Sequence, residues 1–325
     1  MSHSIAAALV AFSALAATAD AGAAGSCPVV DVMPEFQSVL ARTAASPMDR
    51  QLQEQKSFVA AHSPLYAADV LGITHPGDLD GMIKEHLPDI RARDKDIDAA
   101  AAALHAKLPG YLDDFRAAFP DFDCNFTIYM MPSFGAFDGA GRRVAGQPAM
   151  VLGVDTIAAY EKPEQLKVFI DHEIFHRYHY QSAGFSDDDG DAAPIWVALW
   201  AEGLATYVSA TMNPQRPLAD ALLLPRDLEE RAQPRVADIA RALRANLDRR
   251  DPAFFGQYFE YGSTSAEAAG LPSRSGYYLG YRVAGRLAKE ATLPELAHLR
   301  GDALRARIAA ALDELSSEKK KPDTR

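Results

Sequence analysis

Apolar residues recur at helical spacing over much of the first third of the chain. Between residues 90 and 119 they follow one another at intervals of three and four, which is typical of a helix that buries one face. These residues are Ile97, Ala101, Leu104, Leu108, Leu112, Phe115 and Phe119. Pro109 and Gly110 interrupt the pattern and predict a break into two helices. We expect residues 22–120 to form an N-terminal helical region.

The pattern changes between residues 126 and 156. The runs FTIYMM (126–131) and AMVLGV (149–154) have the composition of short strands. The glycine-rich stretch between them predicts a hairpin loop, because Val144 stands where a dinucleotide-binding fingerprint needs its third glycine. From Pro163 onward the pattern is helical again. The sequence thus predicts an α+β fold that is mostly helical, with a small, mainly antiparallel sheet.

The segment DHEIFHRYHY (171–180) carries the clearest chemistry. His172, Glu173 and His176 form an H-E-x-x-H pattern. Residues four apart on a helix lie one above the other, so the two imidazoles can supply two of the three protein ligands of a catalytic zinc ion. Glu173 lies beside the same face and can act as general base. A helix beginning at Pro163 would carry the pattern on a buried element; the alternative is a helix with two surface histidines.

A third ligand is expected on a helix downstream. Glu202 lies within the apolar residues 195–212, where a carboxylate is costly to bury unless it is paired or bound to a metal. The alternative is a solvent-facing glutamate. His179 lies on the same stripe as the two ligand histidines, and we expect it at the solvent rim rather than hydrogen-bonded behind the ligands. Asp171 and Thr206 are further candidates for supporting hydrogen bonds.

HEIFH followed by a helix with EGLATY resembles the gluzincin metallopeptidases. With GYYLGY (276–281), residues 126–290 are similar to the DUF2268 group of predicted zinc-dependent proteases. The resemblance implies a zincin-like metallopeptidase domain over residues 121–315, with the sheet packed on the H-E-x-x-H helix and with Zn²⁺ as cofactor. It also implies a ligand set, a general base and a tyrosine that stabilises the oxyanion. The implied ligands are His172, His176 and Glu202, and the implied general base is Glu173. The implied tyrosine is Tyr277, with Tyr278 and Tyr281 as alternatives.

Two further features bear on this resemblance. In gluzincins an edge strand before the H-E-x-x-H helix pairs with the extended substrate, and residues 150–155 would hold this position unless they form an ordinary buried strand. The segment between His176 and Glu202 is longer than in the well-studied gluzincins. Its acidic residues, at 187–189 and 191, could bind calcium, although a solvated acidic loop is the favoured interpretation.

The first residues predict export. Residues 5–19 are apolar, are too short to span a membrane, and end in Ala19-Asp20-Ala21, which is typical of a signal-peptide cleavage site. We expect residues 1–21 to be a signal peptide and the mature protein to be periplasmic or secreted; the alternative is a buried alanine-rich helix. No Lys or Arg precedes the apolar run, which departs from the usual pattern.

Export changes how the two cysteines are interpreted. Cys27 and Cys124 could form a disulfide in an oxidising compartment, or remain two free thiols. Lipid attachment at Cys27 is a minor alternative, because the preceding residues lack the leucine of a lipobox. Two cysteines are too few for a disulfide-dense scaffold or a cysteine-rich zinc domain.

Length and charge narrow the range of partners. The chain has 325 residues, of which 48% are hydrophobic, enough for two lobes or one large domain before a polar tail at residues 316–325. Its net charge of −11 disfavours nucleic acid or an anionic membrane as partner. A peptide or protein substrate fits the resemblance best. The alternative is an exported helical binding or scaffold protein with a structural or catalytically inactive metal site.

Overall fold

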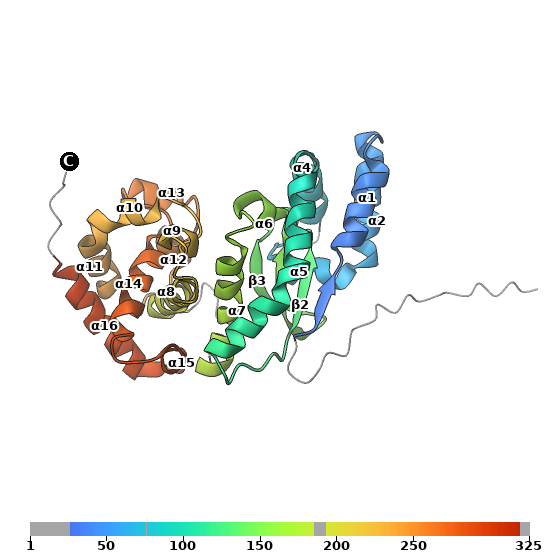
Figure 1. Ribbon diagram of the computed structural model, residues 1–325. Coiled ribbons are helices and arrows are strands. Elements are labelled where there is room, and N and C mark those ends of the chain that lie inside the picture. Colours follow the sequence, from blue (N-terminus) through green and yellow to red (C-terminus); the bar gives the residue numbers. More distant parts are fainter. Residues whose placement is uncertain (1–26, 76, 185–192, 319–325) are drawn as a thin grey trace, which may run out of the picture.

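Four short strands in a mostly helical chain form one mixed sheet (Figure 1). The computed structural model describes residues 27–75, 77–184 and 193–318. The sheet and helices α1–α7 lie on one side of the molecule and α8–α16 on the other, with α7 and α8 in contact between them. This confirms the expected α+β class. The predicted signal peptide, the acidic segment at 187–191 and most of the polar tail lie outside the described residues.

The elements follow the chain in two groups, with the 3₁₀ helices written as η. The first group is β1 (Val29–Asp31), α1 (Met33–Thr43), α2 (Met48–Ala61), η1 (Ser63–Tyr66), α3 (Ala68–Leu71), α4 (Asp78–Ala92), α5 (Asp94–Ala118), β2 (Thr127–Met131), β3 (Gly139–Val144), β4 (Gln147–Gly153), α6 (Val154–Tyr160) and α7 (Leu166–Ala183). The second is α8 (Ile195–Met212), α9 (Leu218–Ala221), α10 (Leu228–Ala232), η3 (Gln233–Arg235), α11 (Val236–Ala245), α12 (Pro252–Phe259), α13 (Thr264–Ala268), α14 (Ser275–Leu287), α15 (Leu293–Ala297) and α16 (Gly301–Ser316).

The sheet is more parallel than the sequence predicted. Its strand order is β1-β2-β4-β3, in which β1, β2 and β4 run parallel and only β3 is antiparallel to its neighbour. The glycine-rich stretch contains the additional strand β3, so the chain reverses twice between β2 and β4. A hairpin joins β3 to β4 through Ala145 and Gly146, both at positive φ (48° and 77°), as a type I′ turn requires. The expected hairpin between the two predicted strands is therefore wrong.

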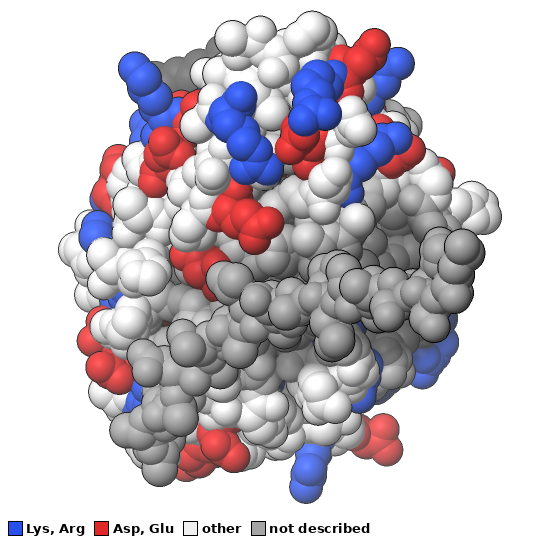
Figure 2. Space-filling view, turned by 90° about the vertical axis from the view of Figure 1, so that its right-hand side faces the viewer, with Lys and Arg blue, Asp and Glu red and all other residues white. Residues whose placement is uncertain are grey.

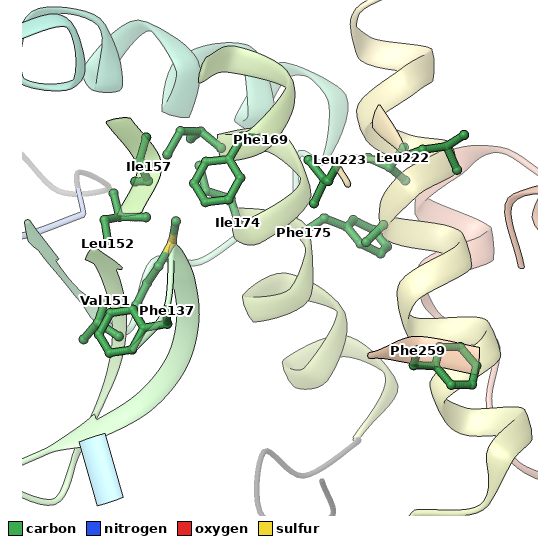
Figure 3. Packing of buried hydrophobic residues seen from close by; sticks show 14 of the residues in the cluster. Phe137, Val151, Leu152, Ile157, Phe169, Ile174, Phe175, Leu222, Leu223 and Phe259 are labelled. Atoms are coloured by element: carbon green, nitrogen blue, oxygen red, sulfur yellow. The ribbon is translucent and has the colours of Figure 1, made fainter. Parts of the chain in front are cut away.

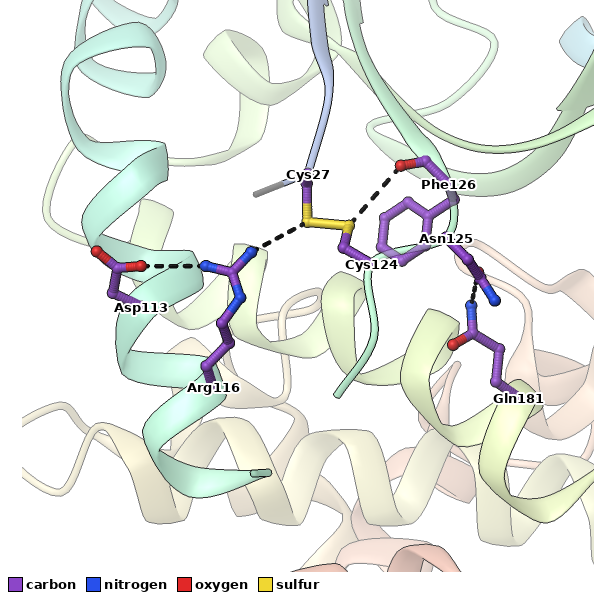
Figure 4. The surroundings of a disulfide bond; sticks show 7 residues. All are labelled: Cys27, Asp113, Arg116, Cys124, Asn125, Phe126 and Gln181. Atoms are coloured by element: carbon purple, nitrogen blue, oxygen red, sulfur yellow. Dashed lines mark hydrogen bonds and ion pairs between the residues drawn. A yellow bond between two sulfur atoms is a disulfide. The ribbon is translucent and has the colours of Figure 1, made fainter. Parts of the chain in front are cut away.

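The N-terminal region is helical apart from β1, which pairs with β2 at one edge of the sheet. A disulfide joins Cys27, just before β1, to Cys124, just before β2, across 97 residues of sequence (Figure 4). The guanidinium of Arg116 lies 3.8 Å from the Cys27 sulfur. Of the alternatives that the sequence left open, the structure has the disulfide, which leaves no thiol at Cys27 for lipid attachment.

Helix α5 runs through the predicted break. Pro109 lies inside it, and the helix continues to Ala118. Proline removes one backbone hydrogen bond, which costs the helix stability. Leu104, Leu108 and Leu112 are nevertheless buried on one face of α5, and this packing holds the two halves in line.

Helix α7 is buried on more than one side, as its position between the two groups of elements requires. Figure 3 shows Phe169 and Ile174 on the side of Leu152 and Ile157, near the sheet, whereas Phe175 lies on the side of Leu222 and Leu223. All of these side chains are buried. The helix begins at Leu166, and the Pro163 that was expected to open it lies in the preceding turn.

The surface beside α1 and α2 carries charges of both signs. In Figure 2 the Lys and Arg side chains of the described residues are interspersed with Asp and Glu, without a broad basic area among them. Ion pairs on α1, α2 and α4 join Arg42 to Glu54 and Lys56 to Asp80. Within the described part of the chain, every helix is too short or too polar to cross a membrane.

Candidate metal centre

Two neighbouring helices bring three ligand-type side chains to one point. His172 and His176 lie one turn apart on α7, and their Nε2 atoms are 3.0 Å from each other. Glu202 projects from α8, with its Oε2 atom 3.5 Å from Nε2 of His172 and 3.4 Å from Nε2 of His176. The three residues predicted from the sequence thus form a compact triangle of donor atoms.

The dimensions of this triangle match a metal site. Tetrahedral geometry with bonds of about 2.0–2.1 Å separates neighbouring ligand atoms by about 3.3 Å, close to all three observed separations. Glu202 Oε2 is buried and has no hydrogen-bond partner among the described residues, so a bound metal ion would satisfy this oxygen. The described residues supply three ligands to this group. A set of two histidines and one glutamate with a fourth position left open is typical of catalytic zinc.

The charge states also suit a cation. Burial lowers the pKa of His172 to about 4, so its imidazole is neutral at physiological pH, the form that binds metals. Burial by itself raises the pKa of Glu202, but the imidazoles of His176 and His172 outweigh this and hold it well below its usual range. The centre therefore presents one carboxylate and a neutral imidazole to an ion.

Glu173 lies next to the ligands and against the edge of the sheet. A Cβ atom added to Gly139 of β3 would lie 2.7 Å from the Cδ and Cγ atoms of Glu173, so the carboxyl group packs directly on the glycine backbone. Burial raises the pKa of Glu173 to about 8, and the charges of Asp138 and Glu202 add to this. A raised pKa makes this carboxylate, once ionised, a stronger proton acceptor than an exposed glutamate. This need for a glycine at position 139 was not predicted from the sequence.

One of the three candidate tyrosines reaches the centre. The ring of Tyr277 is nearly parallel to that of His172, with centroids 6.2 Å apart, and its hydroxyl interacts with Glu202 and Arg274. Burial raises its pKa well above the usual value, so the phenol stays protonated and able to donate. Tyr278 instead donates to Gln233 at 2.8 Å.

The remaining tyrosine lies elsewhere on α14. The ring of Tyr281 packs against that of Tyr207, with centroids 5.7 Å apart. Tyr277 is therefore the candidate that the structure places beside the ligands.

A glycine pair sets the distance between α8 and α14. A Cβ on Gly203 would lie 2.3 Å from the Cα of Gly280, and a Cβ on Gly280 would lie 2.6 Å from the Cα of Gly203. No other residue type fits either position without moving a helix. Gly203 follows Glu202 directly, and Tyr277 lies one turn before Gly280. The contact therefore brings the third ligand and the tyrosine together.

The other supporting candidates have different roles from those expected. Asp171 accepts hydrogen bonds from Lys167 (2.9 Å) and Asn213 (2.7 Å), which ties α7 to the end of α8. Thr206 donates to the backbone carbonyl of Glu202 at 2.8 Å, within α8. His179 is fully buried and stacks on Phe175, and burial lowers its pKa to about 3. The expectation of a rim histidine is wrong, because the core covers α7 on that side too.

The strand next to the centre is β3. Strand β4, which was expected at an edge, lies between β2 and β3 and is paired on both sides. β3 is the edge strand on this side of the sheet and contacts α7, while Arg142 of β3 donates a hydrogen bond to the Val70 carbonyl of α3. Any strand pairing with a substrate near Glu173 would therefore involve β3 rather than β4.

Two residues at the centre went unnoticed in the sequence. Gly139 is one of several glycines in a loop-like stretch, and Arg274 lies outside the H-E-x-x-H and EGLATY segments. Arg274 precedes α14 at positive φ (59°), and its guanidinium lies 3.8 Å from the centroid of the Tyr277 ring. No protein-family model matches the chain, and neither curated proteins nor solved structures show a significant similarity to it.

Proposed function

We propose that this protein is an exported zinc-dependent peptidase. The observation that carries the proposal is the triangle of His172, His176 and Glu202, with Glu173 and Tyr277 beside it. Two imidazoles and one carboxylate form a donor set of intermediate softness, which suits zinc. The three-ligand arrangement favours a catalytic over a closed structural site.

Each side chain of the centre has a separate role in amide hydrolysis. A bound zinc ion would supply Lewis acidity, polarising the scissile carbonyl and making water more acidic. Glu173 accepts the proton of the attacking water and delivers it to the leaving nitrogen. Tyr277 donates a hydrogen bond to the oxygen that gains charge in the transition state. Gly139 and the pair Gly203–Gly280 keep these groups in place.

An extended peptide suits the surroundings of the centre. The outer strand β3 lies beside Glu173 and could add a substrate strand through main-chain hydrogen bonds, which would make recognition depend little on side chains. The disulfide between Cys27 and Cys124 supports action in an oxidising compartment outside the cytoplasm. Hydrolysis of peptides or unfolded proteins there is the activity proposed.

The test is digestion of a broad peptide library by the zinc-loaded protein, with and without chelator. We expect cleavage that chelator abolishes and zinc restores. Glu173→Gln should keep its zinc and its melting temperature but lose about 10²–10⁴ in rate, because an amide of the same shape cannot accept the proton. Glu164→Gln removes an exposed carboxylate just before α7 and should retain full activity.

Two results would contradict the proposal. Full activity in a metal-replete Glu173→Gln protein would remove the general base from the mechanism. A zinc-loaded wild type that cleaves nothing in the library would favour the alternative, an exported binding or scaffold protein whose metal site is not catalytic.

A further inference from the structure

Arg274 is a partly buried cation that lies against the Tyr277 ring and has no carboxylate partner among the described residues. Its Nε atom is buried without a hydrogen-bond partner, and the side chain forms no ion pair with a carboxylate of the described residues. Arg226, another partly buried arginine, is bound to Glu161 at 3.0 Å. A buried guanidinium without such partners is costly, which points to a partner that arrives with the substrate.

The position of Arg274 relates it to the metal centre. Its guanidinium lies 3.8 Å from the centroid of the Tyr277 ring, and that ring is nearly parallel to His172, a metal ligand. Its charge acts on Glu173 and Glu202. Any group bound by Arg274 would therefore lie close to the scissile bond.

The backbone conformation of Arg274 and the burial of Ser275 also indicate a binding site at this position. Arg274 adopts a left-handed conformation (φ 59°), which is uncommon for residues other than glycine, asparagine and aspartate. Ser275, the first residue of α14, is fully buried, and its Oγ atom also has no partner among the described residues. Two adjacent side chains at the N-terminus of a 13-residue helix thus have unmet hydrogen-bonding capacity, where the helix dipole favours an anion.

We propose that Arg274 binds a carboxylate of the peptide substrate. The planar guanidinium can donate two parallel hydrogen bonds to a carboxylate, a geometry that a single ammonium cannot offer. The proposal rests on the proposed peptidase activity for the identity of the ligand. A peptide can present this group in two ways, as its C-terminus or as an acidic side chain near the cleaved bond. The first would direct the enzyme toward chain ends, and the second toward acidic sequences.

The test measures binding by calorimetry, separately from turnover. Zinc-loaded Glu173→Gln protein is titrated with N-acetyl-trialanine as the free acid, with its C-terminal amide, and with the amide that carries aspartate as last residue. We expect at least one carboxylate probe to bind about tenfold or more tightly than the plain amide. Arg274→Asn in the same background should abolish this difference, since asparagine tolerates the left-handed backbone but carries no charge.

A matched control removes an arginine elsewhere on the same helix. Arg286→Gln, which loses ion pairs with Glu314 and Glu318, should leave the preference intact. Tight binding of the free acid alone identifies the C-terminus as ligand, and tight binding of the aspartyl amide identifies a side chain.

Several outcomes would overturn the inference. These are equal binding of all three probes, no binding of any of them, and an equal loss for all probes in Arg274→Asn. Failure of this inference can be distinguished from failure of the proposed peptidase activity. A protein that cleaves no peptide but still prefers carboxylate probes through Arg274 would have the binding site without the activity.

Discussion

Replacing Gly280 by alanine tests how the centre is held together. The added Cβ would lie 2.4 Å from the carbonyl oxygen of Leu199 and 2.6 Å from the Cα of Gly203. Both neighbours are backbone atoms of α8, so no side chain can rotate away. Helices α8 and α14 must instead separate by about 1 Å to restore ordinary contact distances.

The expected cost combines two opposing effects. Overpacking of this kind destabilises by about 1–3 kcal/mol, and the upper end applies because only whole helices can move. Alanine is a better helix former than glycine by about 1 kcal/mol, which offsets part of the loss. We expect a net destabilisation of about 1–2 kcal/mol and a melting temperature lower by several degrees. Because Tyr277 moves away from Glu202, activity should fall as much as 10²-fold.

The assay compares thermal unfolding by circular dichroism with peptide hydrolysis at saturating zinc. Gly110→Ala is the matched control, because Gly110 lies within α5 and a Cβ there would meet nothing within 4 Å. That variant should be as stable as the wild type or up to about 1 kcal/mol more stable, with unchanged activity. A Gly280→Ala protein that melts at or above the wild-type temperature and retains full activity would refute the reasoning.

Two further predictions concern the tyrosine and the disulfide. Tyr277→Phe should lower kcat by less than Glu173→Gln does and leave KM almost unchanged, because the hydrogen bond from Tyr277 is needed mainly in the transition state. Steady-state kinetics on variants with equal zinc content test this. A changed KM with a normal kcat would contradict it. Replacing both Cys27 and Cys124 by serine should lower the free energy of unfolding by up to about 4 kcal/mol, because the bridge closes a long loop in the unfolded chain. Urea titration measures this, and an unchanged midpoint would contradict a stabilising role of the bridge.

The sequence predicted the elements of this fold better than their arrangement. The apolar residues 195–212 match α8 in the structure, because periodicity and length reflect a buried helix directly. The sheet topology was missed, since alternation marks a strand but not the direction of its partner. Strand β3 reads GAGRRV, a polar and glycine-rich run whose strand conformation comes from pairing with β4. Pro109 was misjudged for a similar reason, because packing of α5 outweighs a local signal.

The residues of the candidate site also differ in how well the sequence predicted them. His172, His176 and Glu202 followed from helical spacing and from the cost of a carboxylate in an apolar helix, and the structure brings them together. Residues whose role depends on contact between segments far apart in the sequence could not be recognised from their local sequence. Gly139 is 34 residues from Glu173, and the environment of Arg274 depends on how α14 packs against α8.

Elemental analysis of the purified protein tests the metal centre most directly. We expect one zinc ion per chain in the wild type, since the site offers a single set of three ligands. His176→Ala should lose it, whereas His105→Ala, which removes an exposed histidine on α5, should keep it. Full zinc content in the His176→Ala protein, or none in the wild type after zinc loading, would contradict the assignment of the centre.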